Sequence, residues 1–463
     1  MAATADEQLL LELIDDARLN LLGDAARYIA SYSPLKSKDP QIQNDLTYFK
    51  VDGALLHQQF AALKPVQPLA WNDDLAAAAR GHDRAMIAAD DQEHQVTGEP
   101  DPVTRDENAG YTGWTDLGEN IFAYASSILE AHAGYMVDWG GPASSGGMQS
   151  PPGHRDNIMD ADFREVGVGV VAESNPQTEV GPLVTTEDFG SRGTHGVFIL
   201  GVAYADKDHD DFYSVGEGTK GLKVSLGADH ATSAAAGGYT LSTDATGRQV
   251  VTLKGAGLTG AAKVTLTLHD GDNVKLDVID GHTLHTSASA TVARGGITEI
   301  DGLGILGLSL AAGAGNQTIV GTAGKDTLSG GAGNDALSGA AGADTIDGGA
   351  GRDHLWGGAG ADSFVFDTAL GANNVDTISG FAHGSDQIDL DHAIFGGIGS
   401  RGALKAGFFH AGTAAHDGND HIIYDTHTGA LFYDPDGTGA DAEVQFATLA
   451  RHPALTAADF MVA

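Results

Sequence analysis

The chain has 463 residues, which is too long for one ordinary domain core, so we expect two to four domains. Its 63 Asp and Glu residues against 25 Lys and Arg give a formal net charge of −38. Such a chain should repel nucleic acids and anionic membranes and attract cations or basic partners. It contains no cysteine, which excludes disulfides, thiolate metal sites and a cysteine nucleophile.

The first part of the chain, residues 1–210, mixes helical and strand-like patterns. Apolar residues recur at helical spacing within 6–30, 73–89 and 125–139, which predicts one helix over each range. Strand-like runs occupy 164–174, 184–190 and 195–205. Helices and strands that share one region in this way predict an α+β domain.

The N-terminus has neither a basic segment nor an uninterrupted apolar run, so we expect no cleaved secretion leader. Apolar windows stay shorter than the roughly 18 residues that a membrane-spanning helix needs. We therefore expect a soluble chain without a transmembrane segment.

The pattern changes over residues 211–315. Short segments of alternating apolar and polar residues are separated by Gly, Asp and Asn turns, and helical signals are nearly absent. This region is predicted to form all-β, sandwich-like modules.

From residue 321 the sequence repeats every nine residues on the template G-G-x-G-x-D-x-U-x, where U is a large apolar residue. The sixth position is aspartate in all five copies: Asp326, Asp335, Asp344, Asp353 and Asp362. The eighth position is apolar: Leu328, Leu337, Ile346, Leu355 and Phe364. Glycine holds the first and fourth positions: Gly321, Gly324, Gly330, Gly333, Gly339, Gly342, Gly348, Gly351, Gly357 and Gly360.

This spacing predicts a calcium-binding parallel β-roll over 316–370. Glycine allows the tight turns whose carbonyls point inward, and one carboxylate per turn completes an oxygen shell of the kind that Ca²⁺ takes. One coil takes two repeats, so Asp326 should face Asp344, Asp344 should face Asp362, and Asp335 should face Asp353, with about three to four ions between them. A flexible Gly-rich linker is the alternative, but five in-phase copies disfavour it. Without metal the carboxylates repel one another, so folding should require calcium.

The repeats resemble the RTX family, and residues 371–463 resemble the C-terminal region of serralysin-type exported proteins. The matching runs are VDTISGFAHGSDQIDL, HIIYDTHTGALFYDPDGTG and LTAADFMVA. In that family an acidic residue followed by apolar residues at the terminus is part of an uncleaved secretion signal, which here corresponds to Asp459–Ala463. The resemblance implies a secreted, extracellular bacterial protein that leaves the cell unfolded through a type I secretion apparatus and folds outside. The turn that begins at Asp434 is a further calcium candidate or a plain hairpin turn.

Residues 5–205 resemble bacterial members of the CAP superfamily, the fold of cysteine-rich secretory and plant pathogenesis-related proteins. The stretches that carry the resemblance are, in order, PLAWNDDLAAAARGHDRAM, TRDENAGY, GENI, GHRDNIM, EVGVGV and TTEDFG. The resemblance implies an α-β-α sandwich with a cleft in which two histidines and two acidic residues hold a divalent metal.

Carried over residue by residue, the cleft ligands are His94, Glu119 and His154. Zinc is the ion that imidazole and carboxylate ligands suit. The second acid of the family's pattern is missing, because Trp139-Gly140-Gly141-Pro142 stands in its place. Asp138 or Glu130 could substitute for it. Alternatively, Glu119 and His154 only form hydrogen bonds that hold the fold together.

Three functions remain open at this stage. The first is a secreted calcium-binding protein whose CAP domain binds an unknown extracellular ligand. The second is a metal-assisted hydrolase or peptidase with Glu119 as general base, although no G-x-S-x-G, HExxH or phosphate-loop motif supports an enzyme. The third is a cell-surface adhesive or structural protein that acts through its central β-modules.

Overall fold

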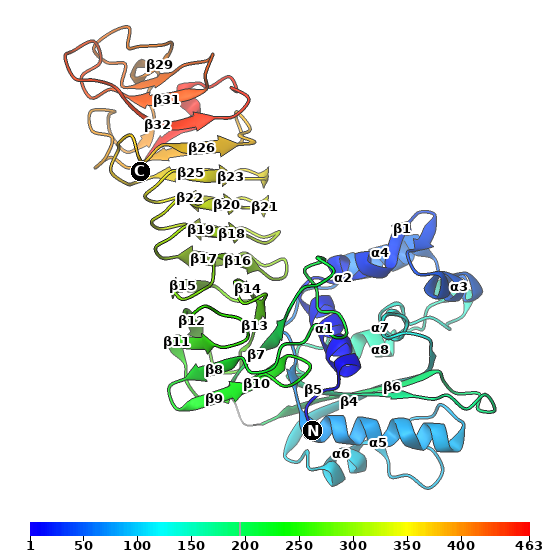
Figure 1. Cartoon of the computed structure of the whole chain (residues 1–463). Coiled ribbons are helices and arrows are strands. Elements are labelled where there is room, and N and C mark those ends of the chain that lie inside the picture. Colours follow the sequence, from blue (N-terminus) through cyan, green and yellow to red (C-terminus); the bar gives the residue numbers. More distant parts are fainter. Residues whose placement is uncertain (194–195) are drawn as a thin grey trace. The chain divides into compact units, whose positions relative to one another are not determined.

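The computed structural model describes residues 1–193 and 196–463, apart from the side chain of Arg294. Residue 195, where one strand-like run was predicted to start, therefore lies outside the described residues. The chain divides into two compact units (Figure 1). The first comprises Met1–Gln249 and Leu268–Asp280, and the second comprises Val250–Thr267 and Gly281–Ala463. None of the helices within the described ranges has the length and apolar character of a membrane span.

The helices are α1 (Ala5–Leu19), α2 (Leu21–Tyr28), α3 (Pro40–Tyr48), α4 (Gly53–Ala62), α5 (Asp73–Ala89), α6 (Pro102–Ala109), α7 (Ile128–Val137) and α8 (Gly153–Ile158). The helices expected at 73–89 and 125–139 correspond to α5 and α7. The single helix expected over 6–30 is wrong, because the chain forms α1 and α2 instead. Asn20 ends α1 and caps α2, with its side chain accepting a hydrogen bond from the backbone N–H of Gly23.

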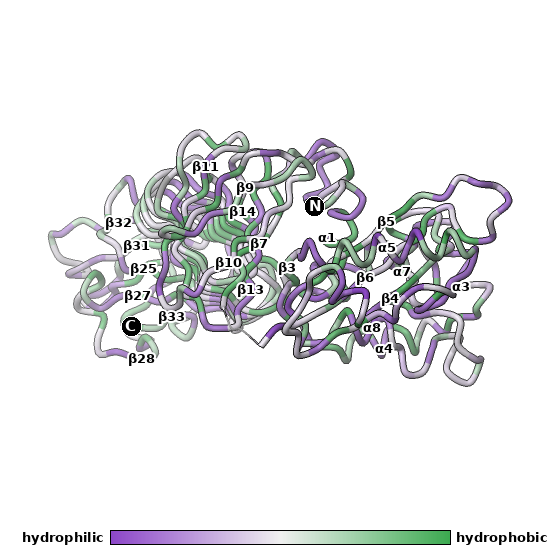
Figure 2. Tube along the Cα trace, turned by 90° about the horizontal axis from the view of Figure 1, so that it is seen from below, coloured by the Kyte–Doolittle hydropathy of each residue, from purple (hydrophilic) through white to green (hydrophobic). Residues whose placement is uncertain are grey.

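The first unit contains a sheet of four strands in the order β3-β5-β6-β4. Its strands are β3 (Ala70–Trp71), β4 (Trp114–Ala125), β5 (Glu165–Ala172) and β6 (Leu183–Arg192). Helices α5 and α6 lie on one side of this sheet and α1, α7 and α8 on the other (Figure 1). The expected α-β-α sandwich is confirmed. Figure 2 shows hydrophobic stretches in the tube at β4, an edge strand of this sheet, and at β5, an inner strand.

Helix α5 lies unusually close to β5, and two glycines of the EVGVGV stretch allow this approach. A Cβ on Gly167 would lie 1.9 Å from the backbone N of Ala76, and one on Gly169 would lie 2.3 Å from Oδ2 of Asp83. The helix itself starts where the Asn72 side chain accepts hydrogen bonds from two backbone N–H groups of the first turn. The alternation of glycine with valine in β5 therefore sets the distance between the sheet and this helix.

A second group of strands in the first unit consists of β7 (Val197–Tyr204), β10 (Gly238–Thr243) and β13 (Asn273–Ile279), with β7 in the middle. Strand β13 is buried at every residue, and it carries a lysine in its interior. Lys275 Nζ lies 2.5 Å from Glu12 Oε2 on α1 and 3.0 Å from Asp277 Oδ1. Asn273 donates to the carbonyl oxygens of Pro68 and Arg164. These buried polar contacts join β13 to the helical part of the same unit.

The remaining strands before the repeats are β1 (Ile29–Tyr32), β2 (Leu35–Ser37), β8 (Lys223–Leu226), β9 (Asp229–Thr232), β11 (Gly247–Lys254), β12 (Ala261–Leu268), β14 (Thr283–Thr286), β15 (Ala290–Arg294), β16 (Glu299–Gly302), β17 (Ser309–Ala312) and β18 (Thr318–Val320). The short strands predicted within 211–315 are thus present. From β14 and β15 onward they already pair in parallel with strands about one coil later. The parallel coil therefore begins before the first nonapeptide, while the predicted domain boundaries stay predictions.

The second unit continues as a parallel coil of two facing rows of short strands (Figure 1). Its strands are β19 (Thr327–Ser329), β20 (Ala336–Ser338), β21 (Ala341–Gly342), β22 (Thr345–Asp347), β23 (His354–Trp356), β24 (Ala359–Gly360), β25 (Ser363–Phe366), β26 (Asp376–Ser379) and β27 (Gln387–Leu390). Register partners are 18 residues apart, as in Leu328↔Ile346 and Leu337↔Leu355. The five apolar residues of the eighth template position are all at most 2% exposed and fill the interior of the coil. The predicted β-roll is confirmed.

The C-terminal strands are β28 (Gly402–Ala403), β29 (Phe409–Ala411), β30 (Ile422–Tyr424), β31 (Ala430–Tyr433), β32 (Val444–Leu449) and β33 (Phe460–Val462). Strand β33 pairs in parallel with β27, and the side chain of Phe460 is fully buried. Asp459, just before it, accepts a hydrogen bond from the backbone N–H of Gly384. The terminal residues that resemble a secretion signal are therefore part of the folded coil.

We predict that Lys275→Met destabilises the first unit by about 3–5 kcal/mol, because it leaves the buried carboxylates of Glu12 and Asp277 without their cation. Urea denaturation followed by tryptophan fluorescence measures this change. Lys223→Met is the matched control, since Lys223 is exposed on β8 and its replacement should change stability by less than about 0.5 kcal/mol. Equal stability of the two variants would contradict the role assigned to Lys275.

Candidate functional site

The aspartates of the nonapeptides form two ladders inside the coil. Each is at most 2% exposed, and one carboxylate oxygen accepts a backbone N–H from the turn 18 residues earlier. Oδ1 of Asp344 accepts from Asp326 N at 2.8 Å, and Oδ1 of Asp362 accepts from Asp344 N at 3.0 Å. On the other edge, Oδ1 of Asp353 accepts from Asp335 N at 2.7 Å. The structure thus brings together the aspartate pairs predicted from the repeat.

The second carboxylate oxygen behaves differently from the first. Within the described residues, Oδ2 is buried without a hydrogen-bond partner in Asp335, Asp344, Asp353 and Asp362. A buried carboxylate oxygen without a partner costs a large part of its hydration free energy. Four such atoms at the same position of successive repeats indicate that a ligand from solution supplies the missing partner of each oxygen.

Backbone carbonyls lie beside these oxygens, and the first glycine of each repeat makes room for them. A Cβ on Gly339 would lie 2.2 Å from Asp344 Oδ2 and 2.6 Å from the carbonyl oxygen of Gly357. A Cβ on Gly330 would lie 2.5 Å from Asp335 Oδ2 and 2.7 Å from the carbonyl oxygen of Gly348. Carboxylate and carbonyl oxygens that converge in this way are the donor set that Ca²⁺ prefers. The residues therefore fit calcium.

The first repeat departs from this arrangement. Thr322 stands where the template has its second glycine, and Asp326 Oδ2 accepts from its backbone N–H at 2.6 Å and from its hydroxyl at 3.2 Å. Asp326 is therefore satisfied by the protein, unlike the other four aspartates. Its role as a calcium ligand stays a prediction, and the structure favours the four later ones.

Two aspartates that the sequence analysis did not single out extend the ladders. Asp376 Oδ1 accepts from Asp353 N at 2.9 Å, and Asp386 Oδ1 accepts from Asp362 N at 3.2 Å. Each is followed two residues later by a buried isoleucine, Ile378 or Ile388, which keeps the D-x-U spacing of the repeat. That spacing was the signal that could have revealed them.

Burial raises the pKa of several of these carboxyls: to about 6 for Asp344 and Asp353 and to about 7 for Asp376. A raised pKa means that the metal-free coil is less stable with these groups ionised. Its stability therefore falls as the pH rises through these values. At neutral pH the metal-free coil holds carboxylates that favour either a proton or a cation.

In the first unit, the cleft candidates His94 and Glu119 lie together. His94 Nδ1 is 2.8 Å from Glu119 Oε1, and the guanidinium of Arg105 contacts the other oxygen, Oε2. Burial alone would raise the pKa of Glu119, but the hydrogen bond with His94 and the charge of Arg105 outweigh it, so the pKa is lowered. Glu119 is therefore an ionised carboxylate with both oxygens engaged.

The other two candidates form a separate pair. His154 Nδ1 lies 2.8 Å from Asp138 Oδ1, and its backbone N–H donates to Asp138 Oδ2. Asp138 ends α7 in a left-handed conformation, with φ of 56°, which turns its carboxylate to α8. Asn120 connects the two motifs by donating to the carbonyl of His154. Glu130 is engaged elsewhere, because it accepts from Ser126 N at 2.6 Å.

Only two groups of three His, Asp or Glu residues in the described ranges bring ligand atoms within 4.8 Å of one another, and neither contains a cleft residue. The cleft set is therefore two hydrogen-bonded pairs in this structure. Its metal-binding and catalytic roles stay predictions.

One of the two groups consists of Asp206, Asp208 and Asp210. Together with Glu217 they occupy positions 1, 3, 5 and 12 of the EF-hand calcium-loop spacing, a sequence signal that was missed. Glu217 folds back into this loop and accepts from the backbone N–H of Lys207. The turn at Asp434, by contrast, is closed by a hydrogen bond from Asp436 N to Asp434 Oδ1, as in a plain Asx-turn.

Comparison with known families agrees with both parts of the chain. Residues 11–188 match the cysteine-rich secretory protein (CAP) family, and residues 312–346 and 338–368 match the RTX calcium-binding nonapeptide repeat. The fold and the ladders thus define a CAP-domain protein with RTX repeats. Residues 11–188 are its CAP domain, and the C-terminal region carries its RTX calcium-binding repeats.

Among solved structures, an extracellular protein with an SCP domain from Bacillus anthracis str. Ames is 21% identical over 34% of this chain and 45% of its own length, with a TM-score of 0.21. A subunit of the mannuronan C5-epimerase of Azotobacter vinelandii is 29% identical over 32% of this chain and 79% of its own, with a TM-score of 0.24. A cysteine-rich secretory protein from Staphylococcus aureus subsp. aureus Mu50 is 15% identical over 34% and 42%, with a TM-score of 0.19. The chain thus spans less than half the length of the Bacillus and Staphylococcus proteins. No curated protein matches the chain significantly.

We predict that Gly339→Ala weakens calcium binding roughly tenfold or more, because its methyl group would occupy the space between Asp344 Oδ2 and the Gly357 carbonyl. A calcium titration of the full chain by calorimetry measures the effect. Gly371→Ala is the matched control, since a Cβ there meets no atom within 4 Å. Unchanged calcium binding by Gly339→Ala would contradict the proposed donor set.

Proposed function

We propose that this is a secreted protein whose second unit folds when calcium fills the aspartate ladders, and whose CAP domain binds an extracellular ligand. The observation that carries the calcium part is the set of four buried Oδ2 atoms without partners, two of which, in Asp335 and Asp344, have a glycine carbonyl nearby. No Lys or Arg forms an ion pair with these aspartates within the described residues. Above the raised pKa values of these carboxyls, where protons no longer neutralise them, a divalent cation can do so.

The free-energy cost of burying these carboxylates supports folding that is coupled to metal binding. Each uncompensated buried charge costs on the order of several kcal/mol, whereas a whole domain is stable by only about 5–15 kcal/mol. A coil with four such carboxylates should therefore be unfolded without calcium at neutral pH. Extracellular calcium modules bind with dissociation constants on the order of 0.1–1 mM, which keeps such sites empty inside a cell and filled outside it.

Export follows from the same coupling. A chain that stays unfolded at low calcium can be threaded through a narrow type I channel, and folding outside would make its passage irreversible. The terminal residues, which resemble a secretion signal, become strand β33 once the coil has formed. One segment would thus be recognised in the unfolded chain and then buried in the folded one.

The ligand part of the proposal centres on His94. Its side chain is 56% exposed, whereas Glu119 behind it is 6% exposed and fixes the ring by a hydrogen bond. An exposed imidazole held in one orientation is suited to contact a ligand. A hydrolase would need Glu119 as a general base, but its lowered pKa and its two occupied oxygens make it a weak base.

We predict that removing calcium from the full chain with a chelator abolishes the strand signal of the second unit in circular dichroism, and that calcium restores it. The first unit should keep its helical signal, because its helices pack on a core of buried apolar residues and several of its buried acids have protein cations as partners. A strand signal that is equally strong in excess chelator would refute calcium-dependent folding.

The four aspartates with a free Oδ2 should matter more than Asp326. We predict that Asp344→Asn raises the calcium concentration at the folding midpoint by about tenfold, and that Asp326→Asn raises it by much less. Circular dichroism during calcium titration measures both midpoints. Equal shifts would show that the hydrogen bonds from Thr322 do not satisfy Asp326 in place of calcium.

A further inference from the structure

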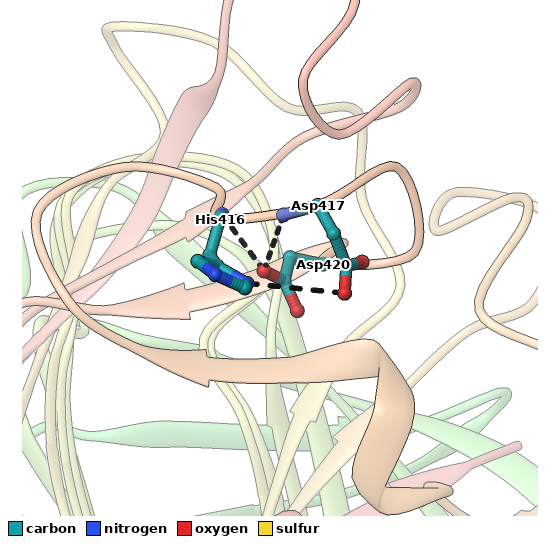
Figure 3. Close-up of side chains that lie close together, drawn as sticks. All are labelled: His416, Asp417 and Asp420. Atoms are coloured by element: carbon teal, nitrogen blue, oxygen red, sulfur yellow. Dashed lines mark hydrogen bonds and ion pairs between the residues drawn. The ribbon is translucent and has the colours of Figure 1, made fainter.

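The second group of ligand-type residues lies near the C-terminus, between β29 and β30. It consists of His416, Asp417 and Asp420, whose ligand atoms all lie within 4.8 Å of one another. Figure 3 shows the ring of His416 and the carboxylate of Asp417 on either side of the carboxylate of Asp420. His416 Nδ1 is 3.9 Å from Asp417 Oδ2. None of these residues belongs to the calcium ladders or to the CAP domain.

A second histidine faces the same group from strand β29. His410 Nδ1 is 3.8 Å from Asp420 Oδ2, and its ring stacks against that of His416 with centroids 5.7 Å apart and planes 17° apart. Gly412 permits this position, because a Cβ there would lie 2.5 Å from Nε2 of His410. A histidine from strand β29 therefore lies beside the group formed by His416, Asp417 and Asp420 in the loop.

The backbone of the loop is already fixed around this group. Asp420 is 8% exposed in its side chain, and its Oδ2 accepts from the backbone N–H groups of His416 at 2.8 Å and Asp417 at 2.9 Å. Next to it, His421 N donates to the carbonyl of Phe408, and Gly412 N donates to that of Tyr424. The ends of the loop are thus held by the sheet, while the side chains of His416 and Asp417 are exposed, with Asp417 Oδ1 accepting from the backbone N–H of Asn419 at 2.8 Å.

We propose that His410, His416, Asp417 and Asp420 bind a transition-metal dication, with zinc as the expected ion. Calcium and magnesium take oxygen ligands, whereas imidazole nitrogens select zinc and its neighbours. A tetrahedral zinc with bonds of about 2.1 Å separates its ligand atoms by about 3.4 Å. The ligand atoms of His416, Asp417 and Asp420 lie within 4.8 Å of one another and His410 Nδ1 lies 3.8 Å from Asp420 Oδ2, so side-chain rotation must bring them closer together around the ion. The bound ion ties the exposed loop to strand β29.

The test is a titration of the untagged full chain with zinc by calorimetry, in calcium sufficient to fill the ladders. Cobalt(II) is the parallel probe, because its visible absorption reports a tetrahedral nitrogen and oxygen environment. The wild type should bind one zinc ion per chain at this site. The double variant His410→Ala/His416→Ala should bind that ion at least tenfold more weakly. The single variant His416→Ala, at a 75% exposed position, should show the same loss with the calcium-dependent fold unchanged.

The matched control is His94→Ala/His154→Ala, which removes two histidines from the CAP domain. This variant should still bind the zinc ion that the His410/His416 group holds. The proposal is overturned if the wild type binds no zinc, if the His410/His416 variants keep that zinc ion, or if the CAP variant loses it. It is also overturned if further calcium displaces the zinc, since the site would then be an oxygen site for calcium.

Discussion

The cost of burying carboxylates without cations governs the second unit. The nine-residue repeat places an aspartate under the same turn every 18 residues, so one oxygen of each is satisfied by the neighbouring turn, and in all but Asp326 the other is left unpaired. The apolar residues two positions later fill the interior of the coil, and the aspartates themselves are buried. The same periodicity that builds the coil thereby creates its need for an external positive charge.

In the first unit, the cost of burying carboxylates is offset in part by basic side chains of the protein itself. This unit also buries many acids, but basic side chains of the protein lie beside several of them, as in Arg80 with Glu7, Arg105 with Glu119 and Lys275 with Glu12. A chain with a net charge of −38 has few basic residues, and these pairs use them inside the first unit. The two units therefore differ in degree, since several buried acids of the first unit have protein cations beside them, whereas the nonapeptide aspartates of the second unit form no such ion pair in the part of the chain that the structure describes.

The nonapeptide ladders could be predicted almost completely from the sequence, because every contact within them repeats at a fixed separation along the chain. Asp344 faces Asp362 for the same reason that Leu328 faces Ile346, and both follow from two repeats per coil. The helical spacing over 73–89 likewise predicted α5, whereas the caps Asn72 and Asn20 were not predicted and one predicted helix became two. The exception within the ladders, Asp326, depends on the hydroxyl of Thr322, a side-chain contact that the template does not describe.

The CAP cleft shows where a pattern is insufficient. Motifs indicated that His94, Glu119, His154 and Asp138 belong to one region, but only the tertiary structure decided that they form two pairs and that Arg105 takes the second oxygen of Glu119. The group at His410 was likewise invisible, because its members come from a strand and an irregular loop without a repeated spacing. Sequence by itself determined what periodicity and local capping dictate. Long-range folding decided which charges meet, because ion pairing depends on distances in space that no local rule specifies.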